Sequence, residues 1–314
     1  MRRSLLTRVE CRRADLVKLR RDFEQDLHAL VRTSGRRSHV VNQLRSIIMP
    51  VGTCALCLET RELRDSHFLP AGFYRIMREG SGEDPVLVNK SAAFMSSAQA
   101  RAHLLCGECE HRFNDGGEDW VLKNCWRSAT NFPLHSALMG ATPFVDEQGF
   151  RSYEGKKIPS VEIDKLAYFG ASIFWRAAVR SWMVGKEKDA RLPLGPYQEA
   201  LRLYLLGKTG IPDGVVQLVT LSALLDDLHN RVSAMPWLFE RKPEYRSYKF
   251  IVTGFTFHMF FGMMIPKPIR HICSGRHGFL YMSEDRDSDL LRTMAVMATR
   301  AEKKGKLRKE PQAM

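Results

Sequence analysis

The sequence lacks any apolar run with the features of a signal peptide or a membrane-spanning helix. Two arginines follow Met1, but no hydrophobic stretch of signal length comes after them. The most apolar stretch, residues 166–184, carries Arg176 and Arg180 near its middle. Two charges at the centre of a bilayer would strongly destabilise a spanning helix. We therefore expect a cytoplasmic protein without a membrane partner, and a buried helix at this stretch.

The sequence also lacks the cysteine pattern of a disulfide-stabilised domain. It has seven cysteines, an odd number, and four of them form two Cys-x-x-Cys pairs. An odd count without a secretory signal favours reduced thiols in a reducing compartment. The two pairs are therefore expected to bind a metal rather than to form disulfides.

The net charge of the whole chain is +13, and acidic residues are scarce at both of its ends. Residues 1–46 carry 12 Lys/Arg and 5 Asp/Glu, and residues 300–314 carry 6 Lys/Arg and 2 Asp/Glu. The net charges of +7 and +4 leave +2 for the 253 residues between. Basic ends suit the phosphate backbone of a nucleic acid, DNA more than RNA here, without reading its sequence. The alternative is a charged, solvated surface that binds nothing.

Composition and periodicity predict an α+β protein in four parts. Residues 1–48 are expected to form a basic amphipathic helical extension, because leucines and a phenylalanine recur there at spacings of three and four. Residues 49–127 contain the cysteine pairs and are expected to form a zinc-binding module. A Pro- and Gly-rich stretch then leads into an α+β domain of unknown role, residues 128–299, with helices and an antiparallel sheet. Residues 300–314 complete the chain as a basic tail.

The same patterns predict the individual elements. Gly116 and Gly117 are expected to break the chain after the second cysteine pair. The predicted helices are residues 71–78, 118–126, 165–184, 196–206 and 287–300, and the predicted strands are a hairpin within 51–70, then 86–88, 102–105, 215–221, 248–264 and 278–282. The aromatic residues of 250–261 are expected to be core rather than a base-stacking surface, because no basic residues interleave them.

The two cysteine pairs, Cys54/Cys57 and Cys106/Cys109, predict a tetrahedral zinc site. Thiolates are soft anionic donors that bind Zn²⁺ at about 2.3 Å. The 48 residues between the pairs are tolerated because loop-closure entropy rises slowly with length. A redox dithiol is the alternative, but neither pair lies in a β-α-β pattern. Four thiolates leave no open position for water, so the zinc is expected to be structural.

The segment between and around the pairs carries a second motif. It reads Asp-Ser-His-Phe-Leu-Pro at 65–70 and Leu-Leu-Cys-Gly-Glu-Cys-Glu at 104–110. In this layout, residues 51–126 resemble the zinc-knuckle branch of the HNH endonucleases. The resemblance is closest to a group of uncharacterised bacterial proteins labelled HNH-like, which share Ser-His-x-x-Pro and Leu-Leu-Cys-x-x-Cys-Glu.

The resemblance implies a treble-clef-like ββα-metal fold and a hydrolase that cleaves nucleic-acid phosphodiesters with Mg²⁺ or Mn²⁺. His67 falls on the general base, and its ordinary pKa near 6.5 suits that role. Ser66 and Phe113 fall where the family usually has metal ligands, and neither is a good ligand for such an ion. Glu110 or Asn114 is therefore expected to supply an oxygen to the catalytic ion.

A catalytically inactive zinc module is the alternative function. Such a module would bind nucleic acid, or a protein partner through the N-terminal helix or the C-terminal domain. His67 would then form a hydrogen bond within the core of the module rather than activate water.

Overall fold

The computed structural model describes residues 49–79, 84–89, 92–96, 98–147, 149–184, 187–223, 232–283 and 302–304. The chain divides into two compact units, Met1–Pro50 and Val51–Met314. The predicted N-terminal helical extension and the predicted helix at 287–300 lie outside the described residues, as does most of the basic tail. The predicted α+β class is confirmed by the mixture of helices and strands in the second unit.

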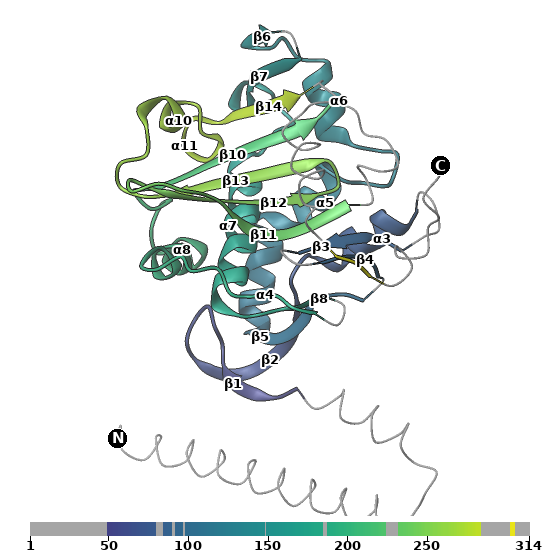
Figure 1. Cartoon of the computed structure of the whole chain (residues 1–314), viewed down its shortest axis with the longest axis vertical. Helices are drawn as coiled ribbons and strands as arrows, with labels where there is room; N and C mark the ends of the chain where they lie inside the picture. Colours follow the sequence, from purple (N-terminus) through teal and green to yellow (C-terminus); the bar gives the residue numbers. More distant parts are fainter. Residues whose placement is uncertain are drawn as a thin grey trace, which may run out of the picture. The chain divides into compact units, whose positions relative to one another are not determined.

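The second unit begins with a small antiparallel sheet. Strand β1 (Val51–Thr53) pairs with β2 (Thr60–His67), which pairs in turn with β5 (Arg101–Cys106) (Figure 1). Between β2 and β5 the chain forms helix α3 (Ala71–Glu79) directly after Pro70, as predicted. Strands β3 (Val86–Val88) and β4 (Ala92–Met95) follow α3, and only the first of them was predicted.

A continuous helical segment follows the second cysteine pair. It consists of α4 (Gly107–Phe113), the π-helical turn η1 (Asn114–Glu118) and α5 (Asp119–Asn124). The predicted break at Gly116 and Gly117 is therefore wrong. A Cβ atom at Gly117 would lie 2.4 Å from the carbonyl oxygen of Lys165, and one at Gly116 would lie 2.5 Å from the Tyr168 ring. The two glycines do not end the helical segment. They allow the later helix that contains Lys165 and Tyr168 to approach this turn closely.

The longest described helix is α7 (Ile163–Val179), which is buried along most of its length and ends earlier than the predicted residue 184. The remaining elements are α6 (Pro133–Met139), β6 (Val145–Glu147), β7 (Phe150–Glu154), η2 (Gly155–Lys157), β8 (Met183–Val184), β9 (Glu187–Lys188), α8 (Tyr197–Leu205), β10 (Val215–Ser222), β11 (Val232–Arg241), β12 (Arg246–Val252), β13 (Phe255–Phe261), α10 (Lys267–His271), α11 (Ser274–His277), β14 (Phe279–Ser283) and β15 (Glu302–Lys304).

Ten of the described strands form one large sheet, in the order β15-β4-β3-β11-β12-β13-β10-β14-β7-β6. The sheet is mixed rather than antiparallel as predicted, because β10 with β14, β11 with β3 and β15 with β4 are parallel pairs. The predicted strand at 248–264 is a hairpin of two strands. Its turn lies at Thr253 and Gly254, whose φ angles of 42° and 80° are those of a tight turn with left-handed residues.

The large sheet draws strands from distant parts of the sequence. Strands β3 and β4 come from the predicted zinc module, whereas β15 comes from the predicted basic tail. The expected boundary between residues 127 and 128 lies inside the second compact unit. The residues around the cysteine pairs and many buried residues of the large sheet belong to one hydrophobic core, whereas other residues of the sheet form two smaller clusters.

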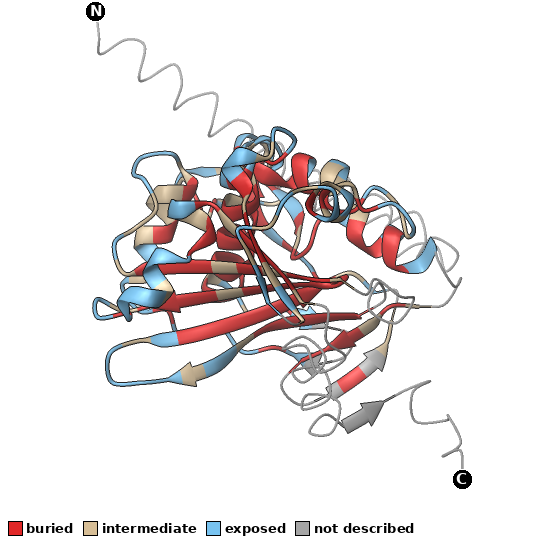
Figure 2. Ribbon diagram, turned by 90° about the horizontal axis from the view of Figure 1, so that it is seen from above, coloured by how far each residue is buried: buried red, intermediate tan, exposed pale blue. Residues whose placement is uncertain are grey.

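Figure 2 shows helices on one face of the large sheet, whose strands are mostly buried. Helix α7 packs its aromatic residues against strands of this sheet. The Phe169 ring lies 5.6 Å from that of Phe257, and the Phe174 ring lies 5.1 Å from that of Phe250. All four side chains are fully or almost fully buried, which confirms that the aromatic residues of 250–261 belong to the core. In the part of the chain that the structure describes, no helix combines the length and the apolar character needed to cross a bilayer.

Candidate metal centre

The first cysteine pair lies in the turn between β1 and β2. The amide of Cys54 donates to the carbonyl of Glu59 at 2.9 Å, and the amide of Leu58 donates to the carbonyl of Cys54 at 2.9 Å. Leu58 has a φ of 65°, a left-handed conformation that non-glycine residues rarely adopt. The amide of Ala55 donates to the carbonyl of Leu104 at 3.0 Å. These bonds fold the turn back on itself and attach it to β5, which leads to the second pair.

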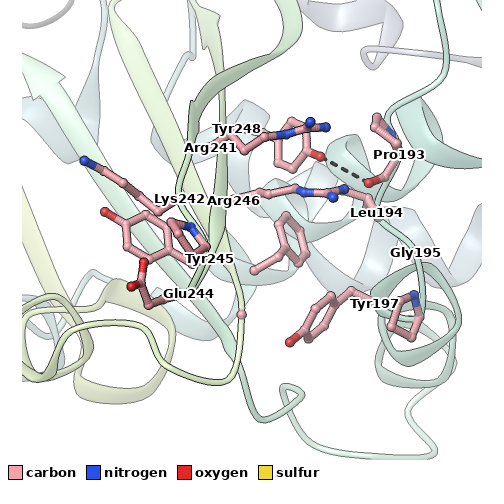
Figure 3. Close-up of a pocket in the computed structure, with 14 residues that line it drawn as sticks. Pro193, Leu194, Gly195, Tyr197, Arg241, Lys242, Glu244, Tyr245, Arg246 and Tyr248 are labelled. Atoms are coloured by element: carbon pink, nitrogen blue, oxygen red, sulfur yellow. Dashed lines mark hydrogen bonds between the residues drawn. The ribbon is translucent and has the colours of Figure 1, made fainter.

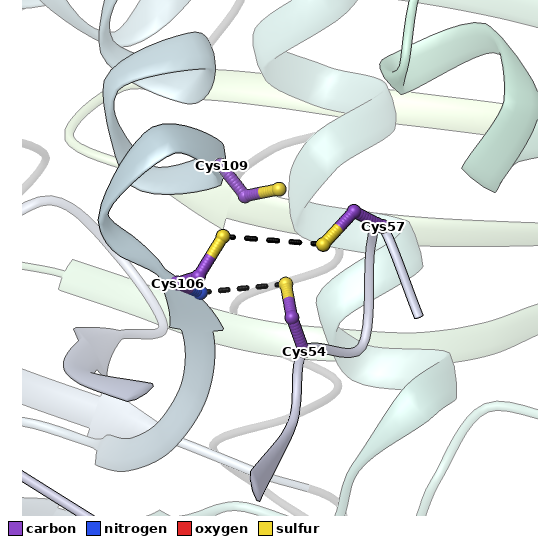
Figure 4. Close-up of side chains that lie close together, drawn as sticks. All are labelled: Cys54, Cys57, Cys106 and Cys109. Carbon is purple, nitrogen blue, oxygen red and sulfur yellow. Dashed lines mark hydrogen bonds between the residues drawn. The ribbon is translucent and has the colours of Figure 1, made fainter. Parts of the chain in front are cut away.

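The second pair lies where β5 passes into α4. Cys106 is the N-cap residue of α4, and Cys109 is in its first turn. Figure 4 shows all four side chains directed toward a common centre, with the amide of Cys106 donating to Cys54 Sγ at 3.3 Å. The partial positive charge of a helix N-terminus favours thiolates at this position.

The four sulfur atoms are close enough to bind one ion. All of them lie within 4.8 Å of one another, and the Sγ atoms of Cys57 and Cys106 are 3.9 Å apart. A tetrahedral zinc ion with bonds of about 2.3 Å requires sulfur separations of roughly 3.8 Å. All four cysteines are free thiols, three of them buried. Both the spacing and the donor type fit a structural zinc ion.

The pKa shifts of Cys54, Cys57 and Cys109 also favour a cation between the thiols. Hydrogen bonds from the Cys109 thiol and from backbone amides lower the pKa of Cys54 to about 4. The pKa of Cys109 is raised, because its thiol donates to Cys54, is buried and faces negative charge. Burial likewise raises the pKa of Cys57. One thiolate thus opposes the ionisation of its neighbours, and a divalent cation would remove that opposition.

His67 is the last residue of β2 and is half-buried. Its Nε2 atom is 2.6 Å from Oε1 of Gln99. Burial has the largest effect on the pKa of His67 and lowers it, and the charge of Arg101 lowers it further. The hydrogen bond to Gln99 and the charges of Asp65 and Glu110 raise the pKa. The net effect is a pKa below the ordinary value, so the imidazole is neutral at pH 7. Helix α4, which carries Glu110, packs against β2, and the charge of Glu110 acts on the His67 ring.

The two positions at which the sequence departs from the HNH pattern are both buried. Ser66 is 1% exposed, and its hydroxyl accepts the amide of Leu105 at 3.2 Å. Phe113 is 0% exposed and packs edge-on against Trp175, with the ring centroids 5.9 Å apart. Both side chains are used to attach α4 and β5 to the core. Neither is free to reach a metal ion near His67.

The two proposed oxygen ligands differ in their surroundings. The Oε1 atom of Glu110 is buried and has no hydrogen-bond partner among the described residues. Asn114, one helical turn later, is exposed. Its neighbours His111 and Asp115 pair with each other at 3.1 Å on the exposed side of the same segment. Within the described ranges, the four cysteines are the one group of three or more His, Cys, Asp or Glu residues close enough to hold an ion.

Comparisons with protein-family models, curated proteins and solved structures found no match to this chain. The resemblance to HNH endonucleases therefore remains a prediction from the motifs.

Two residues near this site were not identified from the sequence as part of it. Gln99 fixes the His67 ring, but a lone glutamine in a loop gives no signal. Arg176 lies in the last turn of α7, forms an ion pair with Glu118 at 2.6 Å and donates to the carbonyl of Phe68 at 3.5 Å. Its guanidinium also lies 4.7 Å from the centre of the Phe113 ring. A charge within an apolar stretch of the sequence was the available signal, because a charge that becomes buried requires a partner.

Proposed function

We propose that this protein is a zinc-stabilised, HNH-like nuclease that hydrolyses DNA phosphodiesters with His67 as the general base. The observation that carries the proposal is the surroundings of His67: a half-buried imidazole with a lowered pKa lies at the end of β2, and α4, the helix of Glu110 and Cys109, packs against this strand. A zinc ion on the four cysteines would hold this helix and strand in register.

The tautomer of His67 follows from its hydrogen bond. The amide oxygen of Gln99 can only accept, so Nε2 carries the proton and Nδ1 has the free lone pair. Nδ1 would take a proton from the water that attacks the phosphorus in line with the departing oxygen. Gln99 would hold the ring in that orientation and stabilise the imidazolium that forms.

The proposed oxygen donors on the helical segment after Cys109 fit a hard cation in part. Glu110 and Asn114 are four residues apart along one helical segment, and one oxygen of Glu110 lacks a partner among the described residues. Mg²⁺ is commonly held by one or two carboxylates, with water and phosphate oxygens completing its shell. Bound there, Mg²⁺ or Mn²⁺ would supply positive charge for the phosphate and the leaving oxygen.

Plasmid cleavage tests this function. Wild-type protein with Mg²⁺ or Mn²⁺ is expected to nick supercoiled DNA, and His67→Ala is expected to slow this by about 10²- to 10⁴-fold, the usual contribution of a general base. The matched control is His103→Ala, an exposed histidine on the neighbouring strand β5, which should cleave like wild type. Equal rates for wild type and His67→Ala would exclude His67 as the base.

A non-catalytic zinc module that binds nucleic acid is the second candidate. The burial of Ser66 and Phe113 favours it, because the usual ligand positions are used for packing. This function predicts DNA binding that weakens steeply with salt, weakens further when residues 1–46 are deleted, and occurs without cleavage in any metal. Binding insensitive to salt would contradict it.

A further inference from the structure

A cavity of about 450 Å³ lies between the loop that precedes α8 and the hairpin of β11 and β12 (Figure 3). This volume is in the range of pockets that hold small molecules. Its lining includes Tyr197, Arg241, Arg246 and Phe261, but none of the four cysteines, His67 or Glu110. The cavity is thus separate from the candidate metal centre.

Two arginines face each other at the mouth of this cavity. Arg241 and Arg246 are directly opposite in the pairing of β11 with β12, and the amide of Lys242 closes the turn between them by donating to the carbonyl of Tyr245 at 2.8 Å. Like charges at opposite positions of a strand pair are destabilising. An anion bound between the two guanidinium groups would reverse that effect.

Glu240, one of the two acidic residues at this end of the hairpin, is engaged away from the arginines. Glu240 pairs with Lys242 at 3.1 Å and accepts the Tyr245 hydroxyl at 2.9 Å. Figure 3 shows Lys242, Glu244 and Tyr245 on the side of the turn away from the arginine head groups, which extend toward Pro193 and Leu194. Within the described part of the chain, no carboxylate forms an ion pair with either arginine.

Aromatic rings form the adjoining wall of the cavity. The Tyr197 ring lies 5.5 Å from that of Phe261, which lies 5.7 Å from that of Tyr248. The Tyr248 hydroxyl donates to the carbonyl of Pro193 at 3.1 Å and ties the loop to the sheet. The Tyr197 hydroxyl, in contrast, has no hydrogen-bond partner among the described residues. Aromatic rings beside two cations suit a base attached to a phosphate.

We propose that this cavity binds a phosphorylated ligand of nucleotide size. The phosphate lies between Arg241 and Arg246, and the base packs against Tyr197 and Phe261. Two sources share this chemistry: a free nucleotide, and the 5′-phosphorylated end of a DNA strand. The site does not depend on His67, so it stands or falls separately from the nuclease proposal.

Calorimetric titration of the full-length protein tests the site. The probes are adenosine 5′-monophosphate, adenosine, and a short DNA oligonucleotide with and without a 5′-phosphate. At least one phosphorylated probe should bind ten times or more tighter than its unphosphorylated counterpart. Arg241→Ala and Arg246→Ala should each weaken its binding by about 10- to 100-fold, as expected for loss of a charged hydrogen-bond partner. Arg127→Ala, an exposed arginine outside the cavity, should bind like wild type.

The outcomes separate the two sources. Binding of the mononucleotide assigns the cavity to a free nucleotide, whereas binding of the phosphorylated oligonucleotide alone assigns it to a strand end. Arg246→Lys, which keeps the charge but loses the two-pronged geometry, provides a milder variant if an alanine variant fails to fold. No preference for either phosphorylated probe, or equal binding by wild type and both alanine variants, would overturn the proposal.

Discussion

The half-buried imidazole of His67 sets the pH dependence expected of catalysis. Burial is the largest effect on its pKa and lowers it below the ordinary 6.5. A general base must be unprotonated, so cleavage should fall as the pH drops through this lowered pKa and be level at neutral pH. The measurement is the single-turnover cleavage rate from pH 4.5 to 8. A rate that rises with pH only above 7 would contradict this placement of His67.

The buried ion pair of Glu118 and Arg176 leads to a prediction for the stability of the protein. Both side chains are almost fully buried, and burial raises the pKa of Glu118 although Arg176 lies 2.6 Å away. Glu118→Ala would leave a buried guanidinium without its carboxylate, which should lower the free energy of unfolding by about 3–5 kcal/mol.

Chemical denaturation measures this loss, and a neighbouring pair supplies the control. Asp119 pairs with Lys123 at 3.6 Å on the exposed side of α5. Asp119→Ala should change the free energy of unfolding by less than about 1 kcal/mol, the usual range for exposed pairs. Equal losses for Glu118→Ala and Asp119→Ala would show that burial does not distinguish the two pairs.

At the scale of elements, the π-helical turn between α4 and α5 is set by its contact with α7. A Cβ at Gly117 would meet the Lys165 carbonyl oxygen at 2.4 Å, and backbone cannot move aside as a side chain can. Gly117→Ala should therefore destabilise the protein by about 1–3 kcal/mol, as overpacking usually does. Thermal unfolding would show this as a lower midpoint. Gly210→Ala, where a Cβ meets nothing within 4 Å, should leave the midpoint nearly unchanged.

Several elements could be predicted because their signals are local. The apolar run of α7, the β-branched residues of β10 and the proline before α3 each determine structure within a few residues. The glycines of the π-helical turn were misread, because a glycine can end a helix or allow another helix to approach. Which of these two roles a glycine has depends on the packing of the folded chain and not on the local sequence.

At the scale of the whole molecule, the large sheet could not be predicted. Its neighbours β3 and β11, and β4 and β15, are far apart in the sequence, and their pairing depends on side chains brought together by folding. In the candidate site, too, one part could be predicted from local sequence and another part could not. Cysteine spacing predicted the four candidate metal ligands, and the structure brings their sulfur atoms together. The surroundings of His67 depend on Gln99, Arg101 and Glu110, which come from other elements.

The candidate metal centre connects two separate elements, the β1–β2 turn and the start of α4, and its cysteines are part of the hydrophobic core. The central claim is that the four cysteines hold one zinc ion that stabilises this arrangement. Removal of the ion should therefore lower the free energy of unfolding, since the energy of metal binding is part of the energy of folding. Cys125, buried and outside the cluster, provides the matched control.

Elemental analysis of the purified protein is the most direct test. We predict about one zinc ion per chain, as for a closed four-cysteine site, with zinc lost in Cys54→Ser and Cys109→Ser and retained in Cys125→Ala. A wild-type protein that folds without bound metal, or a Cys109→Ser variant that retains as much zinc as wild type, would contradict the account.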